Sequence, residues 1–497
     1  MNQNVDVVTA QGTVRGLRGD DSVVFLNIPY SAPLVGAGRF QAPRPHDPWT
    51  GVRNATEPGP NAPQAERRLG RIDMSPYFGP GWIPGDDYLT LNVWTPETAT
   101  ADARLPVMVF VHGGGFVAGS TRSQVYDGAA FARDGVILVT LNYRLGIPGF
   151  LHLPGAPDNR GLLDVVAALR WVRENIAAFG GDPGTVTLFG QSAGATIVAA
   201  LLATPEAEGL FRRAIVQSGS GLGAFTTEQA TRVTRAAAAA LGVEPRAESF
   251  ADIPDRRLVE VISELSGIDL RTATHHDPLI GLSPFSVVLD QQPAEAVAAG
   301  RGAAVDLLTG TTTEEGNLYL APFGTLSSST DADVTAAAAR SHREPARLVE
   351  TYRKARPLAS SGELRSAIMG DALFGLGTRR LADAHAGHRT SATYVYSFAW
   401  RSTALGGELG AAHTMELPFV FDTTTLPGLR GPESLLGPDE PPADLATRTH
   451  TAWITFATTG DPGWNRYDVT HRTTKIIDEK ETLADDPRGT ELEAWPE

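Results

Sequence analysis

The chain has no cysteine among its 497 residues. Disulfide bonds, thiolate metal sites and a cysteine nucleophile are therefore excluded. It also lacks any uninterrupted run of about 18 apolar residues, so we expect no membrane-spanning helix. The N-terminal segment MNQNVDVVTAQGTVRG lacks the basic and apolar parts of a signal peptide. We therefore expect a cytoplasmic location.

Positive charge is in the minority. Lys and Arg number 42 against 57 Asp and Glu, which gives a formal net charge of -15. This balance opposes non-specific binding to nucleic acid and to anionic membranes, so we expect neither as a partner. The apolar fraction of 42% is typical of a globular chain. A chain of this length buries roughly three quarters of its unfolded surface.

Three continuous apolar runs predict buried strands. They are VMVFV (107–111), VILVTL (136–141) and VTLF (186–189). None alternates with polar residues, which is typical of strands buried on both faces of a parallel sheet. Shorter strand candidates lie at 12–16, 23–26, 305–308 and 394–398.

The segment 162–181, between the second and third runs, predicts a helix that stops at Gly180-Gly181. Its apolar residues Leu162, Val166, Leu169 and Val172 recur at spacings of three and four. Strand, helix and strand together predict a right-handed βαβ unit in a parallel sheet. We therefore expect an α/β fold.

Alanine-rich stretches indicate further helices at 225–265 and 330–388. No internal repeat, long linker or low-complexity tail divides the chain. We expect one domain over 1–497, with helical insertions at roughly 225–285 and 325–388.

The sequence Gly190-Gln191-Ser192-Ala193-Gly194 follows the third apolar run directly. G-x-S-x-G between a strand and a helix is the nucleophile-elbow pattern, in which a sharp turn raises the serine hydroxyl above the sheet. The helix that begins at Ala193 directs its free N–H groups toward that hydroxyl. An ordinary glycine-rich turn is the alternative.

A second glycine-rich segment, His112-Gly113-Gly114-Gly115-Phe116, follows the first apolar run. Loops of this kind supply oxyanion donors in lipases and esterases. We assign the N–H groups of Gly114, Gly115 and Ala193 to an oxyanion hole. His112 is assigned a structural role.

With these two motifs the chain resembles the type B carboxylesterases, which include the cholinesterases and bacterial para-nitrobenzyl esterases. Similar segments follow in order along nearly the whole chain; among them are FLNIPYSAP (25–33), LTLNVWTP (89–96), LNYRLGIPGFL (141–151), GTTTEEG (310–316) and AAHTMELPFVF (411–421). The resemblance implies an α/β-hydrolase fold. This is a central, mostly parallel sheet flanked by helices, with a small β-rich N-terminal entry and with the insertions forming the upper part of a substrate gorge.

The resemblance also implies the partners of Ser192. Glu315 matches the acidic position of the catalytic triad, with Glu314 as the alternative. His413 matches the histidine position, and the order Ser, Glu, His is the one such hydrolases have. No metal-ligand spacing such as HExxH occurs, so we expect neither a metal nor another cofactor.

Other residues receive roles from the same resemblance. The residues expected to bind substrate are Phe116, Leu318, Tyr319, Gln191 and Ser218, and Ser218 is also expected to lie near the triad. Further candidates at the gorge are Tyr77, Phe78, Trp82, Phe285 and Phe421, and the expected buried ion pairs are Arg144 with Asp164 and Arg39 with Asp86. The chain departs from the family at Gln191, where Glu is frequent, and at Thr414, where Gly is frequent.

The predicted function is a serine carboxylesterase that cleaves small to medium aryl or alkyl esters through an acyl-enzyme. The same triad acting on carbamate or amide bonds, or as a transacylase, is the main alternative. A lipase is less favoured because no exposed amphipathic lid is evident. A non-catalytic cholinesterase-like binding protein is the remote alternative, since such proteins tend to lose triad residues. The expected partner is a small-molecule ester, and the chain is expected to be a monomer or a homodimer.

Overall fold

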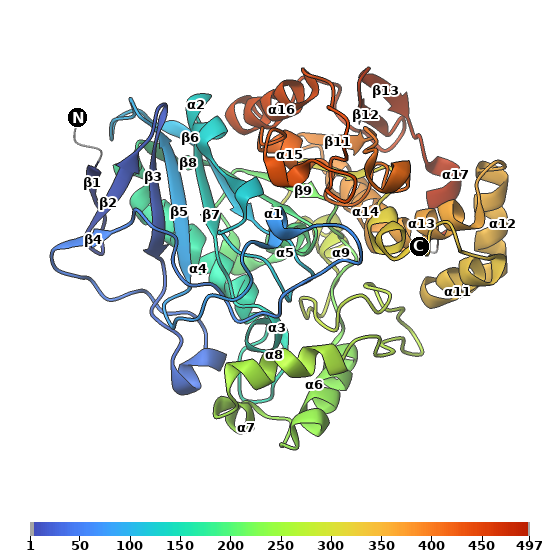
Figure 1. The fold of residues 1–497 in the computed structure, drawn as a ribbon, viewed down its shortest axis with the longest axis horizontal. Coiled ribbons are helices and arrows are strands. Elements are labelled where there is room, and N and C mark those ends of the chain that lie inside the picture. The colour runs from blue at the N-terminus through green and yellow to red at the C-terminus, as the bar shows by residue number, and fades with distance from the viewer. Residues whose placement is uncertain (1–3, 496–497) are drawn as a thin grey trace.

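A mixed β-sheet of 13 strands runs through the centre of the molecule (Figure 1). The computed structural model describes residues 4–495. The strands lie in the order β1-β2-β3-β5-β7-β6-β8-β9-β10-β11-β12-β13, and β4 pairs with β2. Their bounds are β1 Asn4–Val8, β2 Thr13–Arg18, β3 Ser22–Pro29, β4 Val52–Asn54, β5 Thr90–Pro96, β6 Leu105–Val111, β7 Ile137–Leu141, β8 Gly181–Gln191, β9 Arg213–Gln217, β10 Asp306–Thr312, β11 Thr393–Phe398, β12 Thr473–Ile477 and β13 Thr482–Asp485.

The central strands, β7 to β12, are parallel, as the apolar runs predict. Antiparallel strands β1, β2, β3 and β5 extend the sheet at the N-terminal edge, and the β12–β13 hairpin closes the other edge. The predicted strand positions are confirmed. The predicted helix and its glycine stop are confirmed, because α4 and the 3₁₀ turn that follows it end at Phe179, and Gly180 comes next with a left-handed φ of 90°. The strands β7 and β8 are not neighbours, since β6 pairs with both.

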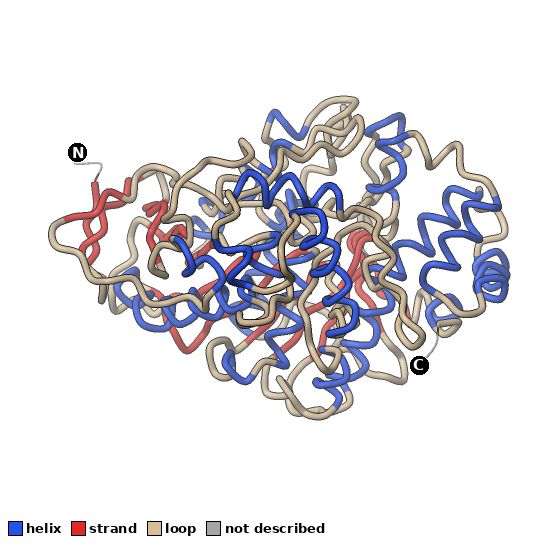
Figure 2. Tube along the Cα trace, turned by 90° about the horizontal axis from the view of Figure 1, so that it is seen from below, coloured by secondary structure: helices blue, strands red, loops and turns tan. Residues whose placement is uncertain are grey.

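Helices cover both faces of the sheet, as the edge-on view shows (Figure 2). The longer ones are α4 Arg160–Asn175, α5 Ala193–Ala203, α6 Thr227–Leu241, α8 Asp255–Glu264, α11 Asp331–Ser341, α12 Pro345–Ala355, α13 Ser361–Gly370, α14 Leu376–Ala386 and α16 Leu445–Thr459. The shorter ones are α1 Ser75–Phe78, α2 Ala129–Arg133, α3 Gly146–Phe150, α7 Ala247–Ala251, α9 Pro293–Ala298, α10 Asn317–Leu320, α15 Leu417–Val420 and α17 Gly489–Leu492.

Successive residues of β6 face opposite sides of the sheet and so separate two cores. Val107, Val109 and Val111 join one apolar cluster, which contains the buried residues of α4 and α5. Met108 and Phe110 join the other cluster, which contains α2 and the buried face of α16. The apolar run in the sequence is therefore continuous because both faces of this strand are covered.

The alanine-rich stretches are helical, as predicted. α6 begins with a capping box between Thr226 and Gln229 and ends at Gly242, whose φ of 69° is left-handed. α11–α14 form the second stretch, which a π-helical turn at Asp371–Gly375 interrupts. The assignment of the whole chain to one domain stays a prediction. Over residues 4–495, the structure contains no helix that is both long and apolar enough to cross a membrane.

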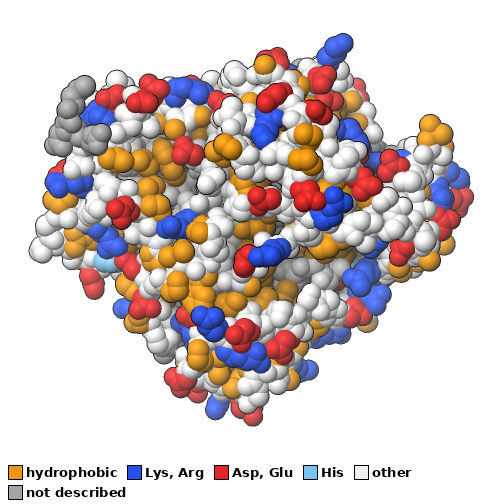
Figure 3. Space-filling model, in the orientation of Figure 1, with side chains coloured by type: hydrophobic (Ala, Val, Ile, Leu, Met, Phe, Trp, Pro, Cys, Tyr) orange, Lys and Arg blue, Asp and Glu red, His pale blue; other side chains and the backbone are white. Residues whose placement is uncertain are grey.

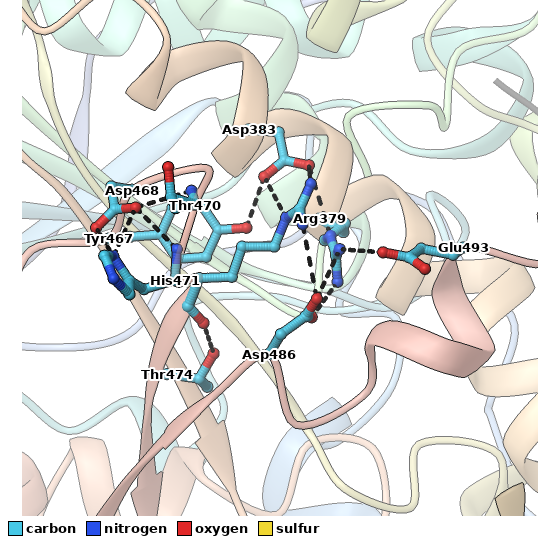
Figure 4. Close-up of polar contacts among 10 residues, drawn as sticks. Arg379, Asp383, Tyr467, Asp468, Thr470, His471, Thr474, Asp486 and Glu493 are labelled. Atoms are coloured by element: carbon cyan, nitrogen blue, oxygen red, sulfur yellow. Dashed lines mark hydrogen bonds and ion pairs between the residues drawn. The ribbon is translucent and has the colours of Figure 1, made fainter.

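Charged side chains of both signs are intermixed on the face seen in Figure 3. Several link elements that are distant in sequence. In Figure 4, Arg379 of α14 reaches Asp383 of its own helix and Asp486, which follows β13. The Tyr467 hydroxyl donates a 2.7 Å hydrogen bond to Asp383. These contacts attach the C-terminal hairpin to α14.

One ion pair is fully buried. Arg144 and Asp164 have 0% side-chain exposure, and the guanidinium donates to both carboxylate oxygens at 2.7 and 2.8 Å. This pair is confirmed. The expected pair of Arg39 with Asp86 is wrong, because Arg39 binds Asp255 at 2.5 Å. Its second terminal nitrogen is occupied by backbone carbonyls at the end of α7, which places the guanidinium beside the start of α8.

Asp164→Asn is expected to lower the free energy of unfolding by about 3–5 kcal/mol, because it leaves a buried guanidinium without a counter-charge. Chemical denaturation followed by tryptophan fluorescence measures this change. Asp6→Asn, which breaks a pair with 40% exposure on each side, is the matched control and should have a far smaller effect. Equal effects of the two variants would contradict the assignment.

Candidate active site

Ser192 occupies the turn between β8 and α5. Its φ of 58° and ψ of -125° are strained for a residue with a side chain, as the elbow pattern requires. Gly194 permits the turn, because a Cβ atom there would lie 2.1 Å from the carbonyl oxygen of Val111. The elbow therefore packs directly on the end of β6.

Two hydrogen bonds form a chain from Ser192 to a histidine and from that histidine to a glutamate. His413 Nε2 lies 2.8 Å from Ser192 Oγ, and His413 Nδ1 lies 2.5 Å from Glu315 Oε2. The three residues come from the elbow, from the loop after β10 and from the loop before α15. All three side chains predicted from the sequence are brought together.

Glu315 is buried and held from several directions. Its Oε1 accepts hydrogen bonds from Ser218 Oγ at 2.6 Å and from the Thr312 N–H at 2.7 Å. Ser218 thus lies near the triad as expected, but it is buried behind the glutamate and does not line the catalytic cavity, so it is not placed to contact substrate. Glu314 points elsewhere, to Arg401 and to the Ala411 N–H. Of the two candidates, only Glu315 contacts the histidine.

The glycine loop after β6 exposes backbone donors beside Ser192. Gly114 and Gly115 have φ values of 116° and 64°. Over residues 4–495, their N–H groups donate to no backbone or side-chain acceptor. Ala193 begins α5, so its N–H has no acceptor within the helix. His112 has a structural position: burial lowers its pKa to about 4, and its ring stacks on Tyr143 at 4.5 Å.

The His413 ring lies flat against Phe374. Their centroids are 4.3 Å apart and the rings are tilted by only 6°. Phe374 belongs to the π-helical turn Asp371–Gly375, and such turns occur frequently at functional sites. Sequence reasoning missed this residue, because no local pattern distinguishes it within a helical stretch.

A largely apolar cavity opens over the triad. The space between its walls, including the open mouth, is ≈ 860 Å³. The predicted Phe116, Leu318, Tyr319 and Gln191 line it. Residues that the sequence did not indicate also line it: Arg67, Leu69, Met74, Tyr126, Thr196, Leu279, Leu282, Ser283, Leu373 and Phe374.

Three of the aromatic gorge candidates, Phe421, Phe285 and Trp82, do not line the cavity. Phe421 packs in the core against Phe110, with ring centroids 4.9 Å apart, and Phe285 is buried in the cluster on the other face. Tyr77 and Phe78 of α1 do line the cavity, whereas Trp82 does not. The helical stretches contribute through residues 279–283 and 373–374 rather than through their longest helices.

Two polar side chains near the triad, Gln191 and Glu416, add little negative charge. The Gln191 amide nitrogen lies 3.2 Å from His413 Nε2 and brings no charge. Glu416 is fully buried, and burial raises its pKa to about 8, so it is mostly protonated at neutral pH. Glu315 is therefore the principal negative charge at the histidine. No cluster of His, Asp and Glu within the described chain has the geometry of a metal site.

Comparison with known proteins agrees with this geometry. A sequence model of the carboxylesterase family matches residues 3–495. The chain belongs to the carboxylesterase family. It is 36% identical over 504 residues to the para-nitrobenzyl esterase of Bacillus subtilis (strain 168), covering 97% of this chain and 96% of that protein. It is also 36% identical to the phenmedipham hydrolase of Pseudarthrobacter oxydans over 472 residues, covering 93% of this chain and 91% of that protein.

Solved structures of carboxylesterases share the fold. A carboxylesterase of Geobacillus stearothermophilus superposes with a TM-score of 0.85 at 34% identity, covering 99% of this chain and 100% of that one. A PNB esterase gives a TM-score of 0.83 at 34% identity and covers 99% of both chains. The α/β-hydrolase fold is thus confirmed, and the protein is a carboxylic ester hydrolase.

Gly194→Ala is expected to abolish ester hydrolysis and to lower the melting temperature, because the new methyl group would overlap Val111. Activity and thermal unfolding are measured together. Gly38→Ala is the control, since the methyl group that it would add meets no described atom within 4 Å beyond its own chain neighbours and the backbone of its own helical turn. A Gly194→Ala variant with normal activity would contradict the close packing of the elbow on β6.

Proposed function

We propose that Ser192, His413 and Glu315 act as nucleophile, general base and orienting acid in ester hydrolysis. The continuous chain of hydrogen bonds from Glu315 through His413 to Ser192, at the floor of the cavity, carries the proposal. The carboxylate accepts the imidazole Nδ1–H, fixes its tautomer and stabilises the imidazolium that forms.

Catalysis follows from this arrangement in two steps. Ser192 Oγ attacks the ester carbonyl while its proton passes to His413 Nε2, and the tetrahedral oxyanion accepts hydrogen bonds from Gly114, Gly115 and Ala193. His413 then protonates the leaving alcohol. Water next attacks the acyl-enzyme with His413 as base. The carboxylic acid product is released, and the Ser192 hydroxyl is regenerated. Each oxyanion donor contributes about 3 kcal/mol to transition-state stabilisation.

Small to medium aryl and alkyl esters are the proposed substrates. The apolar side chains that line the cavity favour an uncharged acyl or aryl group, and aromatic rings of Tyr77, Phe78 and Tyr319 offer surfaces for an aryl group. The names of the two bacterial relatives favour aryl substrates, and the second relative adds carbamates as a second candidate class. Location in the cytoplasm and a monomeric or homodimeric state remain predictions.

Ser192→Ala is expected to lower kcat by roughly a million-fold, because it removes the nucleophile while the fold remains. Purified protein is screened against aryl esters, short-chain alkyl esters and aryl carbamates, with the variant alongside. Turnover that persists in Ser192→Ala would exclude the acyl-enzyme mechanism. Selective turnover of carbamates would favour the second substrate class.

Glu315→Gln is expected to lower kcat by roughly ten-thousand-fold, because the amide no longer stabilises the imidazolium or fixes the right tautomer. Glu314→Gln is a matched control one residue away and should keep most activity, since Glu314 contacts Arg401 instead. The steady-state kinetics of both variants on one aryl ester decide the assignment. The reverse order of losses would exchange the two roles.

A further inference from the structure

Arg67 is the charged side chain among those that line the catalytic cavity. The other lining residues are apolar or neutral, apart from the titratable His413, and Glu315 does not line the cavity. Arginine stays protonated in proteins, so the cavity carries a permanent positive charge. Gln191, beside the nucleophile, supplies no compensating carboxylate.

Arg67 also has no acidic partner. It forms no ion pair with any carboxylate of residues 4–495, and the neighbouring Glu66 pairs with Arg68 instead. Nη1 donates one hydrogen bond, to the carbonyl oxygen of Gly114 at 2.9 Å. The guanidinium carbon lies 5.6 Å from the centre of the Phe78 ring. One of its five N–H donors is thus used, and the rest remain for another acceptor.

The fold holds this side chain beside the glycine loop. A methyl group on Gly115 would lie 3.2 Å from Nη1 and 3.7 Å from Nη2, so the guanidinium is adjacent to the glycine loop. The segment that carries Arg67 is attached to the same loop. Gln64 accepts from the Gly119 N–H at 2.9 Å and donates to the Gly119 carbonyl at 3.0 Å.

We propose that Arg67 is a specificity-determining residue that binds a carboxylate on the substrate, so that the enzyme prefers esters whose acyl or alcohol part carries that group. A guanidinium binds a planar carboxylate through paired hydrogen bonds. Removal of the cavity from bulk water strengthens the interaction. A phosphate dianion is disfavoured, since a single cation faces it. This proposal rests on the proposed ester hydrolysis by Ser192 and adds a class of substrate to it.

Two pairs of esters test the preference, one for each side of the scissile bond. On the alcohol side, 4-carboxyphenyl butanoate is compared with 4-carbamoylphenyl butanoate. On the acyl side, the monoethyl ester of adipic acid is compared with the neutral compound in which the free carboxyl group of that ester is replaced by a primary amide. The two compounds of each pair differ in charge but hardly in shape. In neither anionic ester can the carboxylate readily attack the ester carbonyl of the same molecule. The readout is the ratio of kcat/KM for the anionic ester to that for the neutral ester.

The expected ratio in the unchanged enzyme is about tenfold or more in at least one pair, as a charge-assisted contact gives. High salt should reduce it. Arg67→Gln should bring the ratio to one or below, whatever it does to the two separate rates, and Arg67→Lys should restore part of it. Arg68→Gln, an exposed neighbour, should leave the ratio unchanged.

A ratio of one or less in both pairs for the unchanged enzyme would overturn the proposal without any variant. Equal losses on both esters in Arg67→Gln would also overturn it and would limit Arg67 to supporting the glycine loop. Failure of the hydrolase mechanism has a different signature: neither ester of either pair is cleaved, or cleavage survives in Ser192→Ala.

Discussion

The contact between the ends of β6 and β8 is the constraint on which the site depends. The backbone after Ser192 lies so close to Val111 that only a glycine fits at position 194. This contact places the glycine loop, which continues β6, beside the serine, which continues β8. The proposed nucleophile and oxyanion donors are therefore held by adjacent strands of one sheet, and both cores of the molecule support those strands.

The electrostatics of the site depend on which acidic or amide side chains near His413 carry a charge. Glu315 accepts from His413, Ser218 and the Thr312 N–H, so protein donors stabilise its charge. Glu416 is buried nearby with a pKa raised to about 8, so a second full charge is largely absent at neutral pH. Gln191 adds none. The cavity therefore has an electrostatic asymmetry, with its negative charge behind the histidine and its positive charge at Arg67.

Much of this was predictable from local sequence. The strand runs, the elbow and the glycine loop are short patterns with a direct geometric meaning, and the family resemblance supplied Glu315 and His413. Phe374, Arg67 and Leu279 were missed because their positions arise from tertiary packing of segments without a motif. Arg39 was misassigned for the same reason: its partner Asp255 lies 216 residues away in a helix that no sequence rule places beside it.

The separation of the triad along the chain has a consequence for biosynthesis. His413 follows Ser192 by 221 residues. At the usual translation rate of about 5–20 residues per second, roughly 10–40 s pass between the emergence of the nucleophile and that of its base. During this interval the serine has no partner to activate it. With the proposed triad, the nascent chain is thus inactive until His413 has been made, and a product truncated before that residue has the elbow but no esterase activity.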